Sequence, residues 1–161
     1  MLPQRSAAYE TAPLTELLAV LLRQFKRPLK SRGVDLTDVD AEQVAYAITA
    51  RAPLSPQART LRDALLALVA ESEGVLARWQ LTFEQALDTA MEAIPGWENT
   101  AEFLEVANIK SNAELRISTG SLLLVALGDP SRLAHVRFLA TRPTDLDSVL
   151  AQRILAFTAN D

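Results

Sequence analysis

The stretch that decides the fold covers residues 113–128 and reads Ala-Glu-Leu-Arg-Ile-Ser-Thr-Gly-Ser-Leu-Leu-Leu-Val-Ala-Leu-Gly. Before this stretch the apolar residues recur at helical spacing, whereas from Ala113 to Thr141 they follow an extended pattern. Helical spacing returns only in the last part of the chain. Such a change of period predicts an α+β fold, in which a small antiparallel sheet packs against helices.

Three predicted strands divide the extended stretch and form an antiparallel β-meander over about residues 113–141. Thr119-Gly120 has the composition of a tight hairpin turn, and residues 128–132 have that of a longer turn. This register gives the sheet an apolar core face made of Leu115, Ile117, Leu122, Leu124, Ala126, Ala134, Val136 and Phe138. The opposite face is mixed and carries Glu114, Arg116, His135 and Arg137 around Leu123 and Val125. A central strand that is apolar on both sides is normally covered on both sides.

An all-α bundle is the alternative that the same residues allow. Asp129-Pro130 can begin a helix that runs to Ala140, and Ser121–Leu127 can be one buried helical turn. A short apolar run does not by itself distinguish a buried strand from a buried helix, so the alternative stays open.

About five helices are predicted before the sheet and one after it. The expected N-terminal helices cover residues 13–27, 40–51, 56–79 and 82–94 and a short segment from Asn99. Their start signals are Asp40 with Gln43, Ser55 with Pro56, and Thr82 with Gln85, and Pro143-Thr144 is expected to start the last helix. Residues 1–12 are predicted to be a flexible N-terminal arm, and residues 13–161 a single α+β domain.

Composition excludes several classes of site. The chain has 161 residues, no cysteine and one histidine, so disulfides, cysteine-based zinc sites and multi-histidine metal sites are excluded. The net charge of −4 argues against binding of nucleic acid, and we expect no cofactor. The first residues do not show the continuous apolar stretch that is typical of a signal peptide, and the apolar runs are shorter than the roughly 18 residues that span a membrane. A cytoplasmic protein is therefore expected, and its richness in Ala, Leu and Arg is typical of GC-rich bacteria.

The mixed sheet face is the main candidate site. Its residues Glu114, Arg116, Leu123, Val125, His135 and Arg137 combine apolar and charged side chains. Such a surface favours a non-enzymatic binding or adaptor protein that self-associates, as a homodimer or with a protein partner.

Two other functions are kept as hypotheses. The first is a sensor of a small anionic ligand, in which Arg116 and Arg137 hold the anionic group. The second is a Mg²⁺-dependent hydrolase, because Glu84, Asp88 and Glu92 recur at i, i+4 and i+8 and so share one helix face. Like charges at this spacing repel each other, and a bound cation would reverse that effect.

Overall fold

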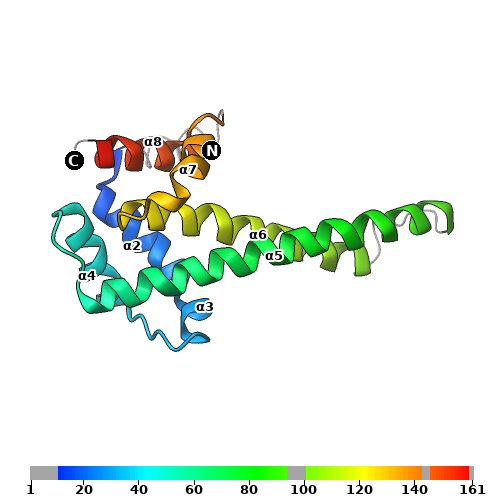
Figure 1. Ribbon diagram of the computed structural model, residues 1–161, viewed down its shortest axis with the longest axis horizontal. Coiled ribbons are helices and arrows are strands. Elements are labelled where there is room, and N and C mark those ends of the chain that lie inside the picture. The colour runs from blue at the N-terminus through cyan, green and yellow to red at the C-terminus, as the bar shows by residue number, and fades with distance from the viewer. Residues whose placement is uncertain (1–10, 94–100, 143–145, 160–161) are drawn as a thin grey trace.

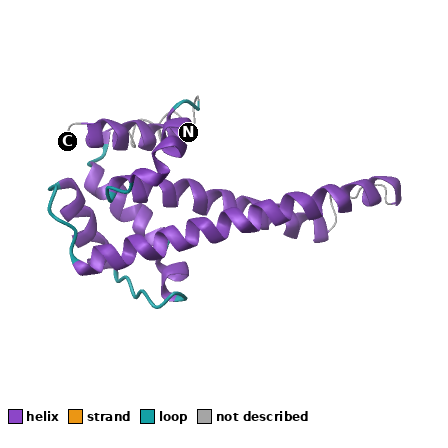
Figure 2. Cartoon of the chain, in the orientation of Figure 1, coloured by secondary structure: helices purple, strands orange, loops and turns teal. Residues whose placement is uncertain are grey.

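The computed structural model describes residues 11–93, 101–142 and 146–159, and every regular element within these ranges is helical. Figure 2 shows the described residues as helices and loops. The predicted α+β fold with a β-meander over residues 113–141 is therefore wrong, and the all-α alternative is the correct one for the described residues.

A long helical hairpin forms the axis of the fold. The elements are α2 (Leu14–Gln24), α3 (Lys26–Lys30), α4 (Asp38–Thr49), α5 (Pro56–Ala93), α6 (Ala101–Ala126), η2 (Pro130–Arg132), α7 (Leu133–Ala140) and α8 (Leu146–Ala159). Helices α5 and α6 lie antiparallel, and the other helices gather around the first half of α5 and the last half of α6 (Figure 1). The far half of the hairpin projects beyond this helical head.

The core lies in the head, where five helices bury leucine-rich faces. Its largest fully buried side chains include Leu18 and Leu22 from α2, Leu61 and Leu65 from α5, Leu122, Leu123 and Leu124 from α6, Leu139 from α7 and Ile154 from α8. Full burial of a leucine contributes about 1.5–3 kcal/mol, so this cluster dominates the stability of the fold. No helix in the described part of the chain combines the length and the apolarity needed to cross a membrane.

The β-meander prediction fails because the end of α6 is covered on all sides. This helix contacts α2, α5, α7 and α8, and every residue from Ser121 to Val125 is buried. A helix that is surrounded in this way needs no polar face, so its apolar residues no longer recur with the helical period of 3.6 residues. The predicted third strand is likewise helical, because residues 133–140 form α7.

Gly120 is the second reason for the wrong prediction. It does not make a hairpin turn with Thr119 but lies within α6, where that helix approaches α5 closely. A Cβ atom at this position would lie 2.5 Å from the Cγ2 of Val69 and 3.7 Å from the ring of Phe25. The glycine therefore permits a close helix–helix contact and does not mark a chain reversal.

Helix starts were predicted in part. Helix α5 begins at Pro56 with Ser55 before it, and the Ser55 hydroxyl accepts the amide hydrogen of Ala58 at 3.1 Å, as the sequence predicts. The predicted start at Asp40 is wrong, because Thr37 caps α4 and Asp40 is the acidic partner in the capping box. The predicted breaks near residues 79–82 are also wrong, since α5 continues to Ala93.

Candidate functional site

A cavity of about 470 Å³ lies where the end of α6 meets α7 and α8. It is lined by Val125, Gly128, Asp129, Pro130, Leu133, Arg137, Leu155, Thr158 and Ala159. Its volume falls within the range of roughly 300–1,000 Å³ that is typical of small-molecule sites. The lining is mainly apolar with few polar groups, which is the usual composition of such sites.

The turn after α6 shapes one wall of the cavity. Gly128 has a φ of +88°, and its N–H donates to the carbonyl of Val125 at 3.0 Å. The next N–H, of Asp129, donates to the carbonyl of Leu124 at 2.9 Å, which completes a Schellman cap. Glycine is needed here because other residues rarely adopt a positive φ. The turn thus ends α6 and leads into η2 and α7, so only the first part of the predicted turn over residues 128–132 is a turn, and Pro130–Arg132 are helical.

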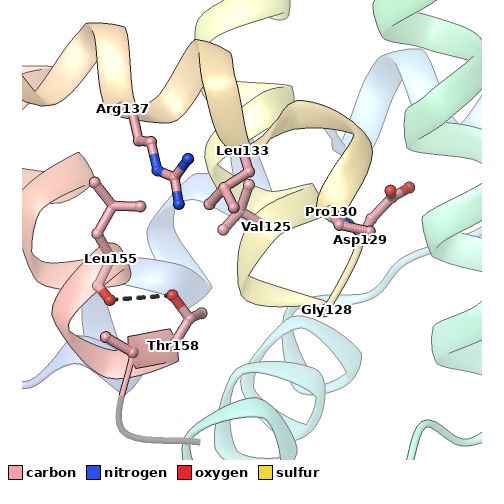
Figure 3. A pocket seen from close by; sticks show the side chains of 9 residues that line it. Val125, Gly128, Asp129, Pro130, Leu133, Arg137, Leu155 and Thr158 are labelled. Atoms are coloured by element: carbon pink, nitrogen blue, oxygen red, sulfur yellow. Dashed lines mark hydrogen bonds between the residues drawn. The ribbon is translucent and has the colours of Figure 1, made fainter.

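Arg137 supplies the positive charge of the cavity. Its guanidinium reaches from α7 into the space beside Leu133 and Leu155 (Figure 3). Among the described residues it has no ion-pair or hydrogen-bond partner. The Asp129 carboxylate points away from it in this view and instead accepts the N–H of Ser131 at 2.9 Å. An accessible arginine above an apolar surface suits a ligand with an anionic group and an apolar body.

Thr158 adds one polar group on the opposite wall. Its hydroxyl donates to the carbonyl of Leu155 at 3.1 Å, as the dashed line in Figure 3 shows. A hydroxyl that donates in this way keeps its lone pairs and can still accept a hydrogen bond. The cavity therefore offers charged donors on the α7 side and a hydroxyl acceptor on the α8 side.

The six residues of the predicted sheet face do not form one surface. Val125 and Arg137 meet in the cavity, whereas Leu123 is fully buried in the core. Glu114 is exposed on α6 and lies 3.8 Å from the ammonium group of Lys110, one helical turn before it. Arg116 is exposed nine residues before Val125, about 13 Å along the helix axis. Because the sheet is absent, the mixed sheet face does not exist as an interface, and self-association stays a prediction.

His135 lies on α7 beside an ion pair that links η2 to α5. The guanidinium of Arg132 donates to both carboxylate oxygens of Glu73, at 2.9 and 2.5 Å. This bidentate pair lowers the pKa of Glu73 and raises the pKa of Arg132. The His135 ring is half-buried, and its Nε2 atom is buried with no hydrogen-bond partner in the described structure.

Burial lowers the pKa of His135 below its ordinary value of 6.5. The positive charge of Arg132 lowers this pKa further, Glu73 opposes the shift, and Arg142 adds to it. The histidine is thus a neutral packing residue near neutral pH.

The lowered pKa of His135 makes stability depend on pH. When the pH falls from about 8 to about 5, the unfolded chain takes up the proton first, near its ordinary pKa. We therefore expect the free energy of unfolding to decrease over this range, before Glu73 begins to titrate below 4.5. Urea unfolding of the wild type and of His135→Gln measures this effect. The variant should lose most of the decrease, and an unchanged pH profile would rule out His135 as its source.

The described part of the structure does not show a metal site formed by the acidic residues that the sequence suggested as Mg²⁺ ligands. Glu84 is exposed on α5, and the side chains of Asp88 and Glu92 lie outside the described residues. Where side chains are described, no three His, Asp or Glu residues lie close enough to hold a metal ion. On the preceding turns, Glu71 and Glu73 are each paired with an arginine, Arg32 and Arg132. The Mg²⁺-dependent hydrolase therefore stays a hypothesis without a described ligand set.

Sequence reasoning missed the contribution of α8 to the cavity. Leu155, Thr158 and Ala159 line it, but their positions in the sequence carry no motif. The apolar stripe of Leu146, Val149, Leu150, Ile154 and Phe157 predicted the helix that contains them, and only the packing of that helix against α7 places them beside Arg137. Comparison of the chain with protein-family models, with curated proteins and with solved structures finds no match in any of the three.

Proposed function

We propose that this protein is a non-enzymatic sensor domain that binds a small anionic ligand in the cavity between α6, α7 and α8. The observation that carries the proposal is the accessible guanidinium of Arg137 above the apolar surface of Val125, Leu133 and Leu155. An arginine that faces a cavity without a carboxylate partner is a ready binding group for a carboxylate or a phosphate.

The proposal differs in one respect from the sensor expected from the sequence. That hypothesis paired Arg137 with Arg116, but Arg116 is on the exposed surface of α6, away from the described lining of the cavity. Arg137 alone is therefore assigned to the anionic group, and the apolar lining is assigned to the body of the ligand. This division matches the usual composition of ligand sites, where a few polar groups orient a mostly apolar molecule.

Thermal unfolding with and without added anions tests the proposal. We expect butyrate, hexanoate or inorganic phosphate to raise the melting temperature of the wild type by several degrees at saturating concentration. A ligand at about 100 times its dissociation constant stabilises the native state by about 2.7 kcal/mol. Arg137→Ala should abolish this increase, because it removes the only charge assigned to the anion.

Arg116→Ala is the matched control, since it removes an exposed arginine from α6 without touching the cavity. It should respond to anions as the wild type does. If both variants lose the response equally, the effect is one of general charge, and the cavity is not the site. If no anion stabilises the wild type, the proposed function is wrong.

A further inference from the structure

A second cavity of about 400 Å³ lies next to the Arg137 cavity, at the turn formed by Leu127 and Gly128. The second cavity is lined by Ile48, Arg51, Ala52, Pro53, Leu54, Val125, Ala126, Leu127, Gly128, Phe157 and Thr158. Val125, Gly128 and Thr158 line both cavities. The two cavities are therefore neighbours that share these three residues. One arginine lines each cavity, Arg137 the first and Arg51 the second.

Arg51 occupies a backbone position that normally belongs to glycine. Its N–H donates to the carbonyl of Ile48 at 3.0 Å, and the N–H of Ala52 donates to the carbonyl of Ala47 at 3.0 Å. These two bonds form the same Schellman cap as the one at Gly128, with Arg51 in the glycine position. It is the one residue other than glycine with a positive φ, +57°, among those that the structure describes. Strained positions of this kind concentrate at functional sites.

The side chain of Arg51 is held in place by the last turn of α8. One terminal nitrogen donates to the carbonyl of Phe157 at 2.7 Å. The guanidinium also stacks on the Phe157 ring, with 4.3 Å between its carbon and the ring centroid. Stacking occupies one face of the planar group and fixes its orientation. Arg51 therefore brings a positive charge of fixed orientation to the second cavity. It does so although its backbone has a conformation that is unfavourable for arginine.

We infer that the ligand is an elongated molecule with an anionic group at each end, one on Arg137 and the other on Arg51. Its apolar stem would lie over Val125, Gly128 and Thr158, the residues that the two cavities share. This inference rests on the proposed function, because it assigns the first anionic group to Arg137. The glycine at position 128 fits such a path, since nothing lies within 4 Å of the Cβ position there.

Isothermal titration calorimetry of the full chain tests the inference. It compares the affinities for straight-chain dicarboxylates, from malonate to suberate, with those for monocarboxylates of equal length. A dicarboxylate of matching length should bind about tenfold tighter than its monocarboxylate. Arg51→Gly should remove this advantage and leave the affinity for the monocarboxylate unchanged. Glycine is chosen because it relieves the positive φ, and Arg51→Asn serves as a second variant that also tolerates it.

Arg59→Ala, an exposed arginine on the first turn of α5, is the charge control and should bind both ligands as the wild type does. Equal affinities for dicarboxylates and monocarboxylates, with both lost in Arg137→Ala, would overturn the inference and leave the proposed function standing. An equal loss of both ligands in Arg51→Gly would also overturn it, because Arg51 would then act only by shaping the site. Absence of all binding would overturn the proposed function together with the inference.

Discussion

Gly120→Ala is expected to destabilise the protein by about 1–3 kcal/mol. The new methyl group would lie 2.5 Å from the Cγ2 of Val69, far inside the usual carbon–carbon contact of about 3.5–4.0 Å. Val69 is fully buried and cannot move away, so α5 and α6 would have to separate. Alanine gains about 1 kcal/mol of helix propensity over glycine, which offsets only part of this penalty. Urea denaturation monitored by circular dichroism measures the change.

Gly74→Ala provides the control with the opposite sign. Gly74 is exposed on α5, and nothing lies within 4 Å of its Cβ position. The substitution should stabilise the protein by about 0.5–1 kcal/mol through helix propensity alone. If Gly120→Ala proved as stabilising as Gly74→Ala, the close contact between α5 and α6 would be refuted.

Leu123→Asp is expected to abolish the native fold. Leu123 has no solvent exposure, and a carboxylate in its place would be buried without a partner. The expected loss exceeds about 4 kcal/mol, which is a large part of the roughly 5–15 kcal/mol by which an ordinary domain is stable. The thermal transition and the dispersion of amide signals in a proton–nitrogen NMR spectrum report whether a folded state remains.

Leu115→Asp on the same helix distinguishes the helical fold from the β-meander. Leu115 is 55% exposed, so the carboxylate would be solvated, and the change in stability should stay within about 0.5 kcal/mol. The sheet register predicts the reverse, because it places Leu115 on the core face and Leu123 on the outer face. A folded Leu123→Asp with an unfolded Leu115→Asp would therefore contradict the structure.

Local signals in the sequence determined several elements of this protein. The helix predicted over residues 13–27 contains α2, and Leu18 and Leu22 on its apolar face are fully buried. Ser55-Pro56 marked the start of α5, and Gly128 marked the turn after α6. These signals succeed because an N-cap, a proline at the first helical position and a glycine at positive φ act within a few residues. The absence of cysteine likewise excluded disulfides without any structure.

Tertiary structure alone decided the conformation of residues 113–140 and the composition of the candidate site. Other helices cover Ser121–Val125 on every side, so no polar residues are needed at regular intervals for contact with solvent. The resulting apolar run resembles the sequence of a buried strand. Arg137 was a candidate in the sequence, but Arg51, which is 86 residues away, was not. The two arginines line neighbouring cavities only because the fold brings the segment after α4, and helices α7 and α8, to the end of α6. Packing between distant segments leaves no local pattern, and for that reason the sequence by itself did not reveal their juxtaposition.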